Sequence, residues 1–215
     1  VDRARHPYPQ AVLAKPDSVK YRIHLAQALI RKDDYAQAQM QLLQTLRIKS
    51  DAHEVYALLS DAYAQQGKLS LAITQAEKAL DHIRLSDHDL RLTYTRKLAL
   101  LLRRDNRPLE ALKVLREMDP ETRTTPDVLE DVAICHAMLG EPAEAAQLYA
   151  RVLAVTLLEN PQPDPRLAVG AVRWALRAGT HTSAAAHLET LRQLYPRAPE
   201  IPEFEKALAH PPAQP

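Results

Sequence analysis

The sequence predicts an all-α fold built from consecutive helical hairpins, and three observations lead to this prediction. A turn-forming residue recurs along the chain at spacings of 34, 39, 34 and 39 residues. An alanine follows each of these residues five positions later, and a residue of small or modest size precedes each by seven positions. Three features recurring in phase indicate a pair of helices that is repeated five times.

Each of the three features has a physical role in a helical hairpin. Gly, Asn and Asp tolerate the left-handed backbone that ends one helix before the next begins; here they are Asp33, Gly67, Asn106, Gly140 and Gly179. Small side chains let paired helices approach closely. The alanines after the turns are Ala38, Ala72, Ala111, Ala145 and Ala184, and the residues before them are Ala26, Ser60, Ala99, Ala133 and Val172. Residues one turn further along would fill the inner face of the second helix, namely Leu42, Ala76, Leu115, Tyr149 and Leu188.

The stretch from His53 to Arg84 shows the pattern most clearly. Tyr56, Leu59 and Tyr63 form one apolar stripe before Gly67, and Leu71, Ala72, Ala76, Ala79 and Leu80 form another after it. Apolar residues at intervals of three and four give each helix one face to bury. Because two helices cannot hide both faces from water, this hairpin needs neighbouring hairpins.

This pattern resembles the tetratricopeptide repeat (TPR) family, whose unit is about 34 residues and two helices. The copy at 53–86 matches the family best, and further copies begin near Val19, Leu92, Pro126 and Pro165. The resemblance implies a right-handed α-solenoid of about five repeats, with partial repeats or caps at both ends. Two junctions, around 86–91 and 160–165, carry five extra residues and should change the rotation between repeats locally.

The resemblance divides the chain into three parts: an N-terminal segment at 1–18, the solenoid at 19–198, and a capping helix with a proline-rich tail at 199–215. Residues 1–10 are expected to be loop-like. Residues 11–16 are interpreted as the end of a preceding, truncated repeat, in which case the native chain extends further, or alternatively as a simple capping helix. Residues 204–209 form either a cap or the first helix of another repeat, and the tail after Ala209 is expected to be disordered or a linker.

The remaining helices are predicted from the same periodicity. Ser86, with an acidic residue three positions later, predicts a capping box for a long helix that ends near Arg104. Proline at the first turn predicts the start of the next helix at Pro108, and this helix is predicted to end at Met118. The other predicted helices are 21–31, 35–48, 143–159, 166–178 and 182–195, with a further one beginning at Thr125-Pro126.

Composition argues against several classes of function. The net charge of +1 gives no general attraction to nucleic acid or to a membrane surface. The single cysteine, Cys135, permits no internal disulfide, and no run of about 18 apolar residues is present. The four glycines form no phosphate-binding loop, and the histidine pairs His82/His88 and His181/His187 have the wrong spacing for a metal on one helical face. His136 and Trp174 are expected to pack rather than to bind a ligand. We therefore predict no catalytic, cofactor or metal site, and a protein that is not an enzyme.

In TPR proteins the first helix of each repeat lines a concave groove, so the resemblance implies which residues face a partner. They are Lys20, Gln27, Arg31, Glu54, Asp61, Arg96, Leu100, Arg103, Arg104, Asp127, Glu130, Arg173 and Arg177. Their charges alternate from repeat to repeat. Neighbouring helices pair these charges with one another, or the charges set the register of an alternately charged partner. The densest cluster, Arg96 with Arg103 and Arg104, is the site where we expect ligand contact.

Some TPR modules hold the carboxylate tail of a heat-shock chaperone with Lys, Asn and Arg side chains. The matching positions here are Ile23, Gln27, Leu58, Thr93 and Lys97, and only Lys97 suits that chemistry. The sequence therefore argues against this mode of binding.

We predict a non-enzymatic scaffold that binds a protein or peptide in its groove, without nucleic acid and without direct membrane insertion. By analogy with the family, it is expected to be a segment of a larger bacterial protein that acts in envelope, polysaccharide or pilus assembly or export. One alternative is a regulatory or positioning domain attached to an enzyme such as a transferase. Another is a module that self-associates through its end repeats. The compartment stays open between bacterial periplasm and cytoplasm.

Overall fold

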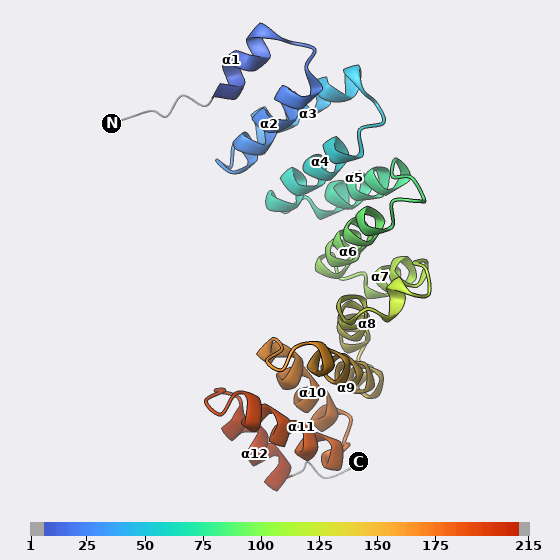
Figure 1. Ribbon diagram of the computed structural model, residues 1–215, viewed down its shortest axis with the longest axis vertical. Coiled ribbons are helices and arrows are strands. Elements are labelled where there is room, and N and C mark those ends of the chain that lie inside the picture. Colours follow the sequence, from blue (N-terminus) through green and yellow to red (C-terminus); the bar gives the residue numbers. More distant parts are fainter. Residues whose placement is uncertain (1–6, 211–215) are drawn as a thin grey trace, which may run out of the picture. The chain divides into compact units, whose positions relative to one another are not determined.

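The fold is given by a computed structural model that describes residues 7–210 (Figure 1). Between these residues the chain forms twelve α-helices and one short 3-10 helix, with no strand, which confirms the predicted all-α class. The helices are α1 (Pro7–Ala14), α2 (Val19–Ile30), α3 (Tyr35–Ile48), α4 (His53–Gln65), α5 (Leu69–Asp81), α6 (His88–Arg104), α7 (Pro108–Arg116), η1 (Thr122–Thr124), α8 (Pro126–Met138), α9 (Pro142–Glu159), α10 (Pro165–Arg177), α11 (His181–Leu194) and α12 (Ile201–Ala209).

The chain divides into two compact units. Unit 1 is Val1–Arg107 and contains α1 to α6, and unit 2 is Pro108–Pro215 and contains α7 to α12. Within each unit every helix packs against the next one along the chain. We call α2, α4, α6, α8 and α10 the first helices, because each ends at one of the five turn residues. The helices that follow these turns, α3, α5, α7, α9 and α11, are the second helices.

All five predicted turn residues adopt the left-handed backbone, with φ between 57° and 76°. At each of them the amide of the following residue donates to a carbonyl five positions back, at 2.8–3.0 Å. The turn residue's own amide donates to the carbonyl three positions back, at 3.0–3.3 Å. These two bonds define the Schellman motif, which satisfies the last carbonyls of a helix. The sequence series therefore corresponds to five copies of one helix-ending turn.

The small residues on both sides of each turn are all fully buried. The five alanines after the turns have no exposed surface, and neither do the five residues before the turns. In unit 1, Ala26 and Ala38 pack in one core cluster with Leu42 and Leu59. In unit 2, Ala133 and Val172 belong to a cluster that also includes Tyr149. Burial at these positions is what the predicted phase requires.

The carboxyl-terminal helix α12 closes the core of unit 2. Ile201 and Phe204 of α12 are buried in the same cluster as Leu188 and Leu191 of α11. An ion pair between Arg192 of α11 and Glu205 of α12 joins the two helices at the surface. The helix therefore covers apolar surface that the last hairpin would otherwise expose to water.

Several local predictions differ from the structure; α2, for example, begins at Val19 instead of residue 21, and α12 begins at Ile201 instead of residue 204. Residues 7–10 are helical rather than loop-like, because the two prolines that suggested a loop lie in the first turn of α1, where a missing amide is harmless. Ser86 does not cap α6: the residue before that helix is Asp87, whose side chain makes no capping hydrogen bond. Helix α7 ends at Arg116, two residues earlier than predicted. The expectations for residues 1–6 and for 211–215 lie outside the described residues.

Candidate functional site

Unit 2 contains a pocket of about 770 Å³ beside two of its first helices. Helix α8 contributes Glu130 and Ile134, and α10 contributes residues along one stripe, spaced by three and four positions. The third wall is the connection between α11 and α12. The lining residues from α10 and from this connection are Pro165, Arg166, Val169, Gly170, Arg173, Trp174, Leu194, Tyr195, Pro196, Arg197, Ala198, Pro199 and Glu200.

The side of the pocket formed by α9 and α10 is apolar and tightly packed. Tyr149 of α9 lines the pocket and is almost fully buried. Trp174 is half-buried and packs against the core cluster of unit 2, as predicted, but it also lines the pocket. The guanidinium carbon of Arg177 lies 4.7 Å from the centroid of the Trp174 ring, at the distance of a cation–π contact.

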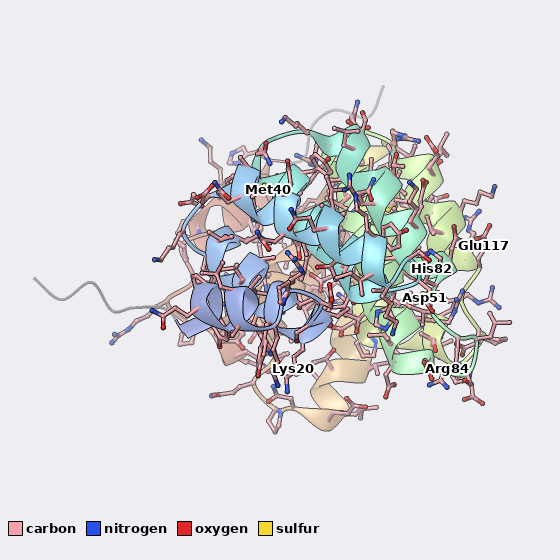
Figure 2. The ribbon with its side chains drawn as sticks, turned by 90° about the horizontal axis from the view of Figure 1, so that it is seen from above. Lys20, Met40, Asp51, His82, Arg84 and Glu117 are labelled. Atoms are coloured by element: carbon pink, nitrogen blue, oxygen red, sulfur yellow. The ribbon has the colours of Figure 1, made fainter. Side chains whose placement is uncertain are left out.

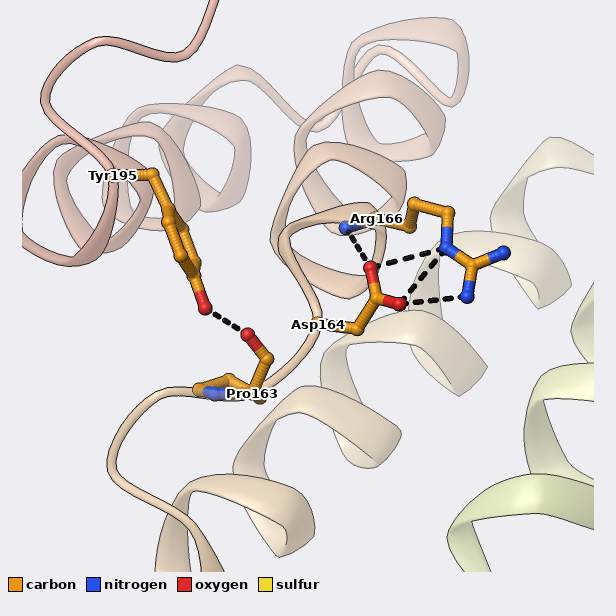
Figure 3. Close-up of polar contacts among 4 residues, drawn as sticks. All are labelled: Pro163, Asp164, Arg166 and Tyr195. Atoms are coloured by element: carbon orange, nitrogen blue, oxygen red, sulfur yellow. Dashed lines mark hydrogen bonds and ion pairs between the residues drawn. The ribbon is translucent and has the colours of Figure 1, made fainter.

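Two polar contacts hold the chain where it enters α10 (Figure 3). Asp164 caps the helix by accepting from the backbone amide of Arg166 at 2.9 Å, and its carboxylate pairs with the Arg166 guanidinium at 2.6–3.0 Å. Hydrogen bonding by Arg166 holds the pKa of Asp164 below its ordinary value. The hydroxyl of Tyr195 donates to the carbonyl oxygen of Pro163, which ties the α11–α12 connection to the segment before α10. The hydrogen bond from Tyr195 thus holds the third wall of the pocket beside the start of α10.

Of the groove residues predicted in unit 2, the structure brings Glu130 and Arg173 together around this pocket. Asp127 is exposed near the start of α8 and does not line it. Arg177 lies one turn beyond Arg173 and does not line the pocket, but its guanidinium lies over the ring of the pocket residue Trp174.

In unit 1 the predicted groove residues of α2 and α4 form cross-helix pairs. Gln27 of α2 donates to the Glu54 carboxylate of α4 at 3.3 Å. Asp61 of α4 pairs with Lys97 of α6 at 2.5 Å. The charges on these first helices are thus partly matched by neighbours within the chain. Lys97, the only position suited to the chaperone clamp, is engaged in one of these pairs.

Two aromatic residues extend the contact between α4 and α6. The rings of His53 and Tyr94 meet edge to face at 5.8 Å between centroids. Burial, with smaller contributions from the carboxylates of Glu54 and Asp61, raises the pKa of Tyr94 above its ordinary value. The hydroxyl of Tyr94 therefore stays protonated across the physiological pH range.

The arginine cluster of α6 is less open than the sequence suggests. Arg96 and Arg103 already interact with other groups of the chain, and the Nε and Nη1 atoms of Arg103 are buried. Arg104 and Leu100 are exposed. Lys20 and Arg31 of α2 are exposed as well, and Figure 2 shows Lys20 on the opposite side of the α2–α3 hairpin from Met40.

Sequence reasoning missed the α11–α12 connection as part of a site. The connection contains none of the turn, small or anchor positions that recur among the repeats, so comparison of repeats gives it no role. A usable signal is present in its prolines, Pro196 and Pro199, which prevent α11 from continuing. The connection then folds as turns, in one of which the amide of Ala198 donates to the carbonyl of Tyr195 at 3.0 Å.

Within residues 7–210 no group of His, Cys, Asp and Glu side chains is arranged to hold a metal ion. In the same range, no helix combines the length and the apolar character needed to cross a bilayer.

No family model matches the chain, and no curated protein matches its sequence. Several solved structures do match its fold. YrrB, described as a TPR protein with an unusual peptide-binding site, aligns with a TM-score of 0.69 at 18% identity, over 94% of this chain and 100% of that one. A TPR protein from Parabacteroides merdae aligns with a TM-score of 0.70 at 19% identity, over 89% of this chain and 72% of that one. PilF from Pseudomonas aeruginosa aligns with a TM-score of 0.67 at 19% identity, over 93% of this chain and 86% of that one. With five in-phase helix-ending turns and fully buried small residues beside each, the chain has the fold of the tetratricopeptide repeat proteins.

Proposed function

We propose that this chain is a non-enzymatic scaffold that binds a protein or peptide segment on the faces of its first helices. The observation that carries the proposal is the pocket of about 770 Å³ beside α8 and α10. A concave site with apolar walls and a few placed polar groups is the usual form of a binding site. The small residues of each repeat are buried between paired helices. The residues of α8 and α10 that line the pocket form a separate stripe on these first helices.

The polar residues of the first helices suit recognition of a peptide rather than chemistry on it. Glu130, Arg166 and Arg173 place both signs of charge beside the pocket. Complementary charges guide a partner into register and exclude wrong partners. In unit 1 the exposed residues Lys20 and Arg31 are the corresponding candidates.

Similarity to proteins of known fold agrees with this proposal. One of the aligned structures, YrrB, is described as having a peptide-binding site. We extend the proposal to a segment of a larger bacterial protein that acts in assembly or export. The alternative, a positioning domain attached to an enzyme, predicts a catalytic domain in the same reading frame, so the complete reading frame separates the two.

The proposal is tested by selecting from a displayed library of random peptides on the immobilised chain. Binding of the enriched peptides is then measured by titration calorimetry with the chain in solution. We expect enrichment of a shared sequence pattern, and weaker binding after Arg173→Glu. The matched control is Arg151→Glu, because Arg151 is exposed on the second helix α9 and does not line the pocket. No enrichment over the bare support, or equal loss of binding in both variants, contradicts the proposal.

A further inference from the structure

The unit 2 pocket combines an apolar surface with arginines that come from two different elements. Val169 and Trp174 of α10, with Ile134 of α8, provide the apolar surface. Arg173 reaches the pocket from α10 and Arg197 from the α11–α12 connection. A ligand that fits this pocket would therefore need both an apolar group and acidic groups.

The absence of a side chain at residue 170 lets the ring of Tyr149 pack directly against the backbone of α10. An added Cβ on Gly170 would lie 2.6 Å from Cε1 and 2.7 Å from Cδ1 of Tyr149. The ring of Tyr149 therefore occupies the space beside the α10 backbone, and any larger residue at 170 would displace it. Since Tyr149 itself lines the pocket, this close approach sets the shape of the apolar surface.

The arginines of the pocket differ in whether a carboxylate of the chain already pairs with them. Arg166 is held by the carboxylate of Asp164 through both Nε and Nη2. Arg173 and Arg197 are exposed, and neither forms a hydrogen bond or ion pair with a residue in the described range 7–210.

The acidic residues of the lining do not offset these two arginines directly. They are Glu130, which already interacts within the chain and acts electrostatically on Arg166, and Glu200, which precedes α12. Two guanidinium groups without a counter-ion in the described chain thus border an apolar surface.

We propose that this pocket selects a peptide segment in which a large apolar side chain is flanked by carboxylates. The inference rests on the proposed function and specifies its ligand. The apolar side chain packs on Trp174 and Val169. Carboxylates on either side of it pair with Arg173 and Arg197, because guanidinium groups match carboxylates with two parallel hydrogen bonds.

The chain supplies its own reporter for a test. Trp174 is the only tryptophan in the sequence, so intrinsic tryptophan fluorescence reads out this pocket alone. The first probe is a capped peptide with the central sequence Glu-Leu-Glu, which contributes no fluorescence of its own. Two matched probes carry Lys-Leu-Lys and Glu-Ser-Glu at the same place.

We expect the Glu-Leu-Glu peptide to change the Trp174 emission at lower concentration than either matched probe. Arg173→Gln and Arg197→Gln should each weaken its binding by about tenfold, as expected for loss of a hydrogen bond to a charged group. Arg151→Gln should leave binding unchanged, and circular dichroism should show the same helicity in all three variants.

Two sets of results overturn the inference. Equal or tighter binding of the Lys-Leu-Lys peptide removes the role of the arginines, as does unchanged binding in both arginine variants. Equal binding of the Glu-Ser-Glu peptide removes the apolar subsite. If library-selected peptides still bind the chain in these cases, the proposed function stands and only the ligand assignment fails. If no selected peptide binds, both fail.

Discussion

Gly170 of α10 lies against the ring of Tyr149 of α9 so closely that a methyl group at residue 170 would overlap it, at 2.6 Å from Cε1. Tyr149 is also the residue that fills the second-helix anchor position of its repeat. The pocket shape in unit 2 thus depends on a pair in which one partner is a glycine in the interior of a helix.

Replacing this glycine should therefore change the stability in a direction that depends on Tyr149. Gly170→Ala forces the ring to move and should lower the free energy of unfolding by about 1–3 kcal/mol, as overpacking does. In the background of Tyr149→Leu the same replacement should be neutral or stabilising, because alanine is favoured over glycine in a helix by roughly 0.5–1 kcal/mol. Urea denaturation of the four members of this double-mutant cycle measures the difference. Additive effects would show that the two residues do not contact each other.

The small residues after the turns should not accept a larger side chain. Ala72 and Ala145 have no exposed surface, so Ala72→Leu or Ala145→Leu should each cost about 1–3 kcal/mol. For a chain of this size that corresponds to a fall in melting temperature of roughly 2–4 °C for each kcal/mol. Ala143→Leu is the control, because Ala143 is exposed on the same helix as Ala145. A melting temperature unchanged in both core variants would mean that the repeat phase is wrong.

Substitutions at the turn residues should lower stability through backbone strain and not through crowding of neighbouring atoms. No heavy atom lies within 4 Å of a Cβ added to Gly67, whose φ is +73°. Gly67→Ala should still lower the free energy of unfolding by about 1–2 kcal/mol, which is the cost of a left-handed backbone for an ordinary residue. Asn106, at φ +57°, is the reciprocal case, so Asn106→Gly should be tolerated without loss. Thermal denaturation followed by circular dichroism compares the two, and equal losses would contradict the role assigned to the turns.

His187 should make the fold less stable in acid. Burial lowers the pKa of His187 below the ordinary value of 6.5, so the folded chain binds this proton less readily than the unfolded chain does. Its contribution is fully favourable above pH 6.5 and is lost as the pH falls below that value. Between about pH 8 and pH 5, His187→Gln should lose less stability than the unmodified chain. Parallel pH profiles for the two chains in denaturant unfolding would contradict this.

Charge reversal at the two neighbouring arginines of α6 should affect the melting temperature differently. The Nε and Nη1 atoms of Arg103 are buried, so Arg103→Glu should lower the melting temperature. Arg104 is exposed, and Arg104→Glu should leave the melting temperature unchanged. Charge reversal at Arg104 is therefore the cleaner test of partner binding at this cluster. A larger thermal loss for Arg104→Glu than for Arg103→Glu would reverse the assignment.

The repeat pattern predicts the fold at the level of single residues because each of its members has a backbone or packing requirement. Glycine, asparagine and aspartate recur where φ is positive, and alanine recurs where two helices touch. Such requirements are local and repeat with the chain, so one sequence is enough to read them. The capping box predicted at Ser86 is wrong because the same residue types also occur in turns, and here α6 begins at His88, after Asp87 instead of after Ser86.

The sequence predicts the binding surface only in part. The phase identifies the first-helix stripe that includes Glu130 and Arg173, but it says nothing of which charges are already paired. Lys97 was considered only as a clamp residue, and its pairing with Asp61 depends on the distance between two helices. The wall from Leu194 to Glu200 runs from the end of the last repeat into the start of α12, and the repeat pattern gives it no role. Only the folded chain therefore reveals that it borders α10.

Amide chemical-shift mapping shows where on the chain a partner binds, and so whether it binds on the faces of the first helices. The isotope-labelled chain is titrated with a library-selected peptide, and the shifted amides are assigned along the sequence. We expect shifts concentrated in α8, α10 and residues 194–200, with α9 and α11 little affected on their exposed sides. Shifts concentrated on the exposed sides of α9 and α11, with α8 and α10 unchanged, would contradict it.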